Sequence, residues 1–214
     1  KVIAPNEQEG TFLWSNAIAI TAIVVSLLSP ILGALADRGG YRKFFLITST
    51  CICAIFSILL YFPNVGDVYF ALSCFVIANI AFEMGSVFCN SYLPDLSNTD
   101  NIGRISGYAW GLGFVGGLLA LFISLFLFDI NNPDEIRKIN ILVGIWFLLF
   151  SIPTFLFVKD RKKEKFNKQH IYSSFQSIKE TFKSIANYRE IYRFLIARLF
   201  FNDGLITIFA LGGV

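Results

Sequence analysis

Long stretches of apolar residues follow one another along the chain, and short polar connections separate them. These stretches cover approximately Phe12–Ala36, Phe44–Phe62, Val68–Leu93, Ile105–Phe128 and Ile139–Val158, and another begins near Ile191 and runs to the end. An α-helix needs roughly 20 such residues to cross the hydrocarbon core of a bilayer. The pattern therefore predicts an all-α integral membrane protein with about six membrane-spanning helices.

Composition narrows the class of protein. Apolar residues make up 55% of the chain, which is high for a soluble domain. The net charge of +3 is too small to indicate a nucleic-acid partner. The four cysteines lie inside apolar stretches without the spacing of a metal site, so we expect structural thiols and no metal or cofactor. No Gly-x-x-x-x-Gly-Lys-Ser/Thr loop is present, which argues against ATP-driven transport by this chain.

The connection between the first two stretches is the most specific motif. It reads Gly33-Ala-Leu-Ala-Asp-Arg-Gly-Gly-Tyr-Arg-Lys43, and its charges mark a membrane surface. It is so short that the two helices must form a tight hairpin. The motif resembles the signature loop between the second and third helices of the major facilitator superfamily, with Tyr41 where that family usually has a basic residue. The resemblance implies a gating loop with these residues: Gly33, Asp37, Arg38, Gly40, Arg42 and Lys43.

The distribution of basic residues predicts the orientation in the membrane. Thirteen lie in the connections of one face, namely Arg38, Arg42, Lys43, Arg104, Lys159, Arg161, Lys162, Lys163, Lys165, Lys168, Lys179, Lys183 and Arg189. Three lie on the other face, namely Lys1, Arg137 and Lys138. Because cytoplasmic loops carry the excess of Lys and Arg, the first face is predicted to be cytoplasmic and the amino terminus external.

The predicted orientation suggests how the chain is divided. A bacterial inner-membrane transporter usually starts inside, so we expect one helix before Lys1 and a partial bundle that holds the second to seventh of twelve helices. Residues 1–158 would form the amino-terminal half without its first helix. Residues 159–190 would form a cytoplasmic linker with an amphipathic helix, either packed under the bundle or sensing lipid. Residues 191–214 would be the truncated first helix of the second half. We expect the bacterial inner membrane as the location, or the vacuolar membrane if the source is eukaryotic.

Polar residues inside two of the stretches are candidates for function. Asn79, Glu83, Ser86 and Asn90 are spaced four, three and four residues apart, so they share one helix face. A carboxylate near the middle of a membrane helix costs roughly 2.5–3.5 kcal/mol and must face a cavity or a partner. The stripe is either a hydrogen-bonded seam between helices or a solute or proton pathway. Asn202 and Asp203, in the last stretch, are further candidates for a substrate or proton pathway.

Glycines are concentrated in the fourth stretch. Gly107, Gly111, Gly113, Gly116 and Gly117 include two Gly-x-x-x-Gly pairs, which let another helix approach closely. We expect these residues to serve helix packing. Gly113-x-x-Gly116-Gly117 also resembles the antiporter-type motif of the fifth superfamily helix, with Gly113 in place of the usual proline.

Several segments together are similar to a narrower family, the vacuole effluxers, which include autophagy-related amino-acid permeases and prokaryotic relatives. The resemblance rests on Gly33–Lys43, Ala78–Glu83, Phe88–Pro94, Ser106–Gly117 and Phe201–Gly204. It implies efflux of small solutes, which for fungal members are amino acids. In the superfamily the first, fourth, seventh and tenth helices line the central cavity, so the resemblance implies that Glu83 and Asp203 lie on cavity helices.

The sequence thus favours a secondary active transporter that moves a small solute by alternating access. We expect efflux, coupling to a proton or another ion, a lipid bilayer as the surroundings and no enzymatic activity. A transport-inactive receptor or scaffold is the alternative. An integral-membrane enzyme is a third interpretation, but it would need clustered His and Asp at an interface, and the single His170 lies in the predicted linker.

Overall fold

A computed structural model describes residues 6–160 and 189–211, apart from the side chains of Glu7, residues 34–39, Asp203 and residues 205–211. All the regular secondary structure in the described residues is α-helical. The helices are α1 (Glu7–Gly39), α2 (Arg42–Leu59), α3 (Val68–Asn90), α4 (Leu93–Leu96), α5 (Ile102–Leu127), α6 (Pro133–Phe157) and α8 (Arg189–Leu211). Within these residues, five spans are long and apolar enough to cross a membrane, with α3 and α4 counted as one. The predicted all-α membrane bundle is confirmed.

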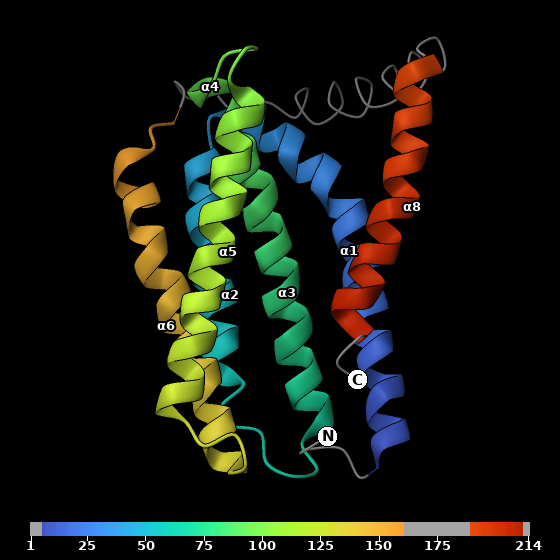
Figure 1. Ribbon diagram of the computed structural model, residues 1–214, viewed down its shortest axis with the longest axis vertical. Helices are drawn as coiled ribbons and strands as arrows, with labels where there is room; N and C mark the ends of the chain where they lie inside the picture. The colour runs from blue at the N-terminus through green and yellow to red at the C-terminus, as the bar shows by residue number, and fades with distance from the viewer. Residues whose placement is uncertain (1–5, 161–188, 212–214) are drawn as a thin grey trace.

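The long helices stand roughly side by side and alternate in direction (Figure 1). One end of the bundle, here called the motif end, carries the α1–α2 turn, α4, Asp160 and the start of α8. The opposite end carries the α2–α3 and α5–α6 turns. The connections that are rich in basic residues therefore share one end of the bundle. That this end faces the cytoplasm stays a prediction.

Only Gly40 and Tyr41 separate α1 from α2, so the turn is much shorter than the motif Gly33–Lys43. Gly40 ends α1 with a φ of 63°, the left-handed conformation that glycine adopts without steric cost, and α2 begins at Arg42. The predicted tight hairpin is confirmed, and Asp37 belongs to the last turn of α1 rather than to a loop. Pro30 lies within α1, which bends over in its last third (Figure 1), as expected where proline removes a backbone hydrogen bond.

The start of α6 was predicted six residues too late, at Ile139. Asn132 caps the helix by accepting a hydrogen bond from the Asp134 N–H at 3.0 Å, and Pro133 occupies the first turn. The first turns of α6 are charged, so the apolar pattern begins only after the helix has already formed. The other spans agree with the prediction more closely.

The core lies towards the motif end, where α1, α2, α3 and the end of α6 meet. Leu46, Met84, Phe88 and Tyr92 form its buried centre. The partly buried side chains packed around it are Val25, Leu32, Phe45, Ile80, Val87, Phe155 and Val158. α2 and α6 also approach closely, because a Cβ added at Gly144 would lie 2.6 Å from Ile58 Cγ1 and 2.9 Å from the Ala54 carbonyl oxygen.

Two helices have little cover. Most side chains of α5 are exposed, and so are the described side chains of α8 from Arg189 to Asn202. Large apolar residues dominate this surface, including Trp110, Phe114 and Phe200. An apolar surface of this extent requires lipid or further protein around it.

Candidate functional site

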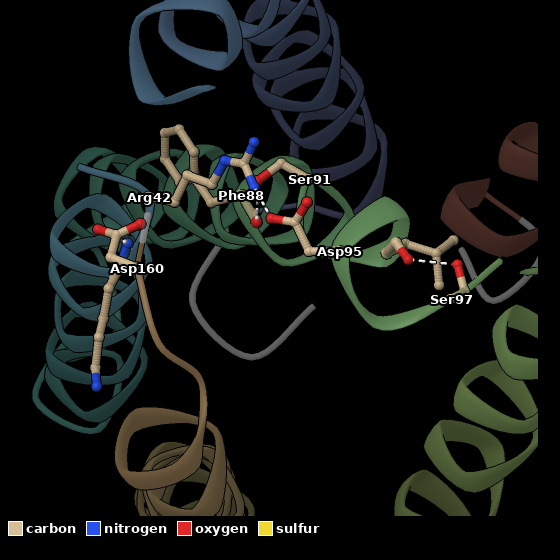
Figure 2. Close-up of polar contacts among 8 residues, drawn as sticks. Arg42, Phe88, Ser91, Asp95, Ser97 and Asp160 are labelled. Atoms are coloured by element: carbon tan, nitrogen blue, oxygen red, sulfur yellow. Dashed lines mark hydrogen bonds and ion pairs between the residues drawn. The ribbon is translucent and has the colours of Figure 1, made fainter. Parts of the chain in front are cut away.

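Four side chains gather at the motif end and form what we call the gate cluster: Arg42, Tyr92, Asp95 and Asp160. Arg42 is the first residue of α2, Tyr92 joins α3 to α4, and Asp95 lies in α4. Asp160 follows the end of α6 by three residues. Figure 2 shows Arg42, Asp95 and Asp160 converging from these separate elements. The cluster therefore connects the start of α2 to α4 and to the residues after α6.

An ion pair between Arg42 and Asp95 is the strongest contact of the cluster. The guanidinium Nη1 lies 2.7 Å from the Asp95 Oδ2, and the two side chains are 6% and 24% exposed. A pair at this distance combines charge attraction with a hydrogen bond. Because the arginine is almost completely desolvated, loss of its partner would leave an expensive buried charge.

Tyr92 supports the same guanidinium from below. The Arg42 guanidinium carbon lies 5.6 Å from the centre of the Tyr92 ring, within the range of a cation–π interaction. Tyr92 is 4% exposed, and within the described residues its hydroxyl has no partner at hydrogen-bonding distance and angle. That hydroxyl interacts electrostatically with Asp160. The tyrosine thus interacts with both the arginine and the second carboxylate.

Asp160 binds the first turn of α2 through the backbone. Its Oδ2 accepts a hydrogen bond from the Lys43 N–H at 3.2 Å, across 117 residues of sequence. Tyr41, the residue that precedes α2, provides no side-chain cap hydrogen bond. The first N–H groups of a helix lack intrahelical partners and attract negative charge. Asp160 therefore serves as the cap that the local sequence does not supply.

The structure brings together only part of the predicted gating loop. Arg42 and the Lys43 backbone join the gate cluster, and Gly40 forms the buried turn. Gly33 lies where α1 meets α3, since an added Cβ would be 3.5 Å from Val87 Cγ1. The side chains of Asp37 and Arg38 lie outside the described residues.

Sequence reasoning missed Tyr92, Asp95 and Asp160 as members of this site. A tyrosine near the end of a span is typical of an interface anchor, whereas Tyr92 is buried. The available signal was that both acids stand at helix ends on the face that is otherwise rich in basic residues. An isolated acid there is a candidate partner for a motif arginine, but the sequence does not say which one pairs with it.

The predicted polar stripe lies on an unpartnered face of α3. Glu83 and Asn90 are exposed, and Asn79 and Ser86 are half-buried. Within the described residues, none of these four side chains has a hydrogen bond or an ion pair. Glu83 also lies next to the midpoint of the span Val68–Leu96. The stripe is therefore not a hydrogen-bonded seam between the described helices.

The other candidate residues are not brought together in the described part of the chain. Asn202 is exposed on α8, and the Asp203 side chain lies outside the described residues. At Gly107, Gly111, Gly113, Gly116 and Gly117, an added Cβ would meet nothing within 4 Å. Close packing on this glycine face stays a prediction.

Comparisons with known proteins agree on a family. The family model described as "Vacuole effluxer Atg22 like" matches residues 9–212. A Bacillus subtilis protein named "Uncharacterized MFS-type transporter YxiO" is 27% identical over 209 residues, which cover 94% of this chain and 49% of the relative. Autophagy-related protein 22 of Kluyveromyces lactis is 23% identical, with 97% of this chain and 48% of the relative covered.

Autophagy-related protein 22 of Yarrowia lipolytica is 22% identical, and the alignment covers 92% of this chain and 46% of the relative. The chain thus spans about half the length of the curated relatives it matches. No solved structure matches it.

Proposed function

The chain belongs to the Atg22-like vacuole effluxer family, and from that premise we propose that the full-length protein is a secondary active transporter of a small solute. In this proposal the protein exports its solute by alternating access, and transport is coupled to a proton. Amino acids are the solute class that the family resemblance favours. The gate cluster would hold one end of the pathway closed while the other end is open.

Glu83 is the single observation that carries the proposal. Its side chain is exposed on α3, next to the midpoint of a membrane span, and within the described residues no cation neutralises it. A carboxylate exposed to lipid at that depth would cost several kcal/mol. A water-filled cavity or a bound cationic group removes that cost. A carboxylate in a cavity of low dielectric also binds and releases protons readily, as coupling requires.

The test replaces Glu83 by Gln in the full-length protein reconstituted in proteoliposomes. Glutamine has the shape of a protonated glutamate but cannot release the proton. The variant should still exchange radiolabelled amino acids in counterflow, but it should lose accumulation against a gradient. Both assays are run on one preparation, so that protein amount cancels from the comparison.

Two variants serve as controls for the Glu83 test. Asp100→Asn removes an exposed acid from the connection between α4 and α5 and should leave both assays unchanged. Asp203→Asn asks whether the other membrane acid holds the proton instead. Full gradient-driven transport by Glu83→Gln would contradict the coupling role. A wild-type protein that is inactive in both assays would favour the receptor or scaffold interpretation.

A further inference from the structure

We propose that Asp160 is a positioning residue of the gate, because its carboxylate holds the first turn of α2 in the place where Arg42 can pair with Asp95. The inference rests on the proposed function, since it assumes that the motif end opens and closes. It adds a residue outside the gating motif, from the far end of the amino-terminal half.

Neighbouring residues connect the two contacts. Asp160 accepts the N–H of Lys43 at 3.2 Å, and the residue before Lys43 is the one that pairs with Asp95 at 2.7 Å. A hydrogen bond to the backbone of a first helical turn fixes the position of that turn. The position of the Arg42 backbone is therefore set in part by a carboxylate that does not touch its guanidinium.

Tyr92 interacts with one member of each of these two contacts. Its ring lies 5.6 Å from the Arg42 guanidinium carbon, and its hydroxyl interacts with Asp160. Figure 2 shows the two hydrogen-bonded contacts, one from Arg42 in α2 to Asp95 in α4 and one from the start of α2 to Asp160 after α6. Moving Asp160 away removes the acceptor of the Lys43 N–H and the negative charge that acts on the Tyr92 hydroxyl.

Asp160 also lies at the start of the connection between α6 and α8. It is the last described residue before 161–188, the segment through which the amino-terminal half continues to α8. A tie at this position connects the start of that segment to the gating motif.

The experiment measures opening of the motif end without measuring transport. Ser86→Cys is introduced as a reporter in full-length protein whose Cys51, Cys53, Cys74 and Cys89 are replaced. An impermeant maleimide is then added from the motif side in vesicles of suitable orientation. Asp160→Ala should raise the labelling rate about fivefold, the population shift that corresponds to loss of one helix cap. Asp160→Asn keeps a carbonyl oxygen for the Lys43 N–H and should stay within about twofold of wild type.

A double-substitution cycle separates positioning from a general structural role. Asp95→Asn should raise labelling by itself, and adding Asp160→Ala should then change little, because both act through Arg42. Independent, additive effects would overturn the proposal. So would a wild-type labelling rate in Asp160→Ala, or an equal rise in Asp160→Asn. Asp100→Ala, a change of an exposed acid at the same end, is the matched control and should have no effect.

Two further outcomes are also decisive. If Asp160→Ala does not reach the membrane, Asp160→Glu is used, because its extra methylene moves the carboxylate off the Lys43 N–H. A rise in labelling then supports the inference, and a wild-type rate overturns it. If the maleimide does not label the reporter cysteine in any variant, including Asp95→Asn, the gate itself is absent and the proposed function fails as well. Labelling in Asp95→Asn alone overturns only the role of Asp160.

Discussion

At the scale of single residues, the side chains of the Arg42–Asp95 ion pair differ in their exposure to solvent. The arginine side chain is 6% exposed and the aspartate 24% exposed, so water can reach only the second when the pair is broken. Asp95→Ala should therefore destabilise the full-length protein by about 3 kcal/mol, because it leaves a buried guanidinium without its ion-pair partner. Arg42→Met, which fills a similar volume without charge, should cost about 1 kcal/mol or less.

Thermal unfolding of the two purified variants in one detergent checks this order. The double substitution Arg42→Met with Asp95→Ala should be more stable than Asp95→Ala alone, because it removes the buried charge together with its partner. Equal losses in the two single variants would show that burial of the arginine does not set the energetics of this pair.

Also at the residue scale, the sequence did not predict which side chains would contact Arg42. Arg42 was expected to act in gating, but its partners lie 53 residues away at Asp95 and, through Lys43, 117 residues away at Asp160. Helical periodicity specifies which residues of one helix share a face and says nothing about which helices become neighbours. The Glu83 stripe could be predicted because all its members lie on one helix. The gate cluster could not, because its members come from three separate segments, the start of α2, the α3–α4 region and the residues after α6.

At the scale of whole helices, Gly144 marks a close approach between α2 and α6. A methyl group at Gly144 would meet Ile58 Cγ1 at 2.6 Å and the Ala54 carbonyl oxygen at 2.9 Å, and a backbone oxygen cannot rotate away. Gly144→Ala should therefore force the helices apart and cost about 1–3 kcal/mol. The unfolding temperature of the full-length variant, compared with wild type in the same detergent, measures this cost.

Gly111 of α5 offers the matched comparison for Gly144. An added Cβ there meets nothing within 4 Å of the described residues, so Gly111→Ala should be neutral or stabilise α5 by up to about 1 kcal/mol. If Gly111→Ala instead destabilises the full-length protein as much as Gly144→Ala does, another helix packs on the glycine face of α5. That result would support the predicted role of the Gly-x-x-x-Gly pairs.

Helix positions could be predicted much better than helix contacts, and the bilayer explains why. Each spanning segment must satisfy its own backbone hydrogen bonds and present an apolar surface of fixed length, so the spans are evident from the sequence. The misplaced start of α6 shows the limit of that signal, because a helix can begin in the polar layer at a residue such as Asn132. Hydropathy describes only the part of a helix that lies in hydrocarbon.

At the scale of the whole molecule, the remaining question is which end of the bundle faces the cytoplasm. The connections that begin and end at the motif end are rich in basic residues in the sequence, and the opposite turns contain few of them, so the motif end is predicted to be cytoplasmic. Thr99 lies exposed between α4 and α5 at the motif end, and Val65 lies exposed between α2 and α3 at the other end. Both are small residues that cysteine can replace with little change in volume.

The orientation is tested by labelling these two positions in intact cells with a membrane-impermeant thiol reagent, in a background without the four native cysteines. Val65→Cys should react from outside, and Thr99→Cys should react only after the membrane is permeabilised. Permeabilised cells therefore give the control in which both positions label. The opposite pattern would invert the bundle and place the gate cluster at the external surface.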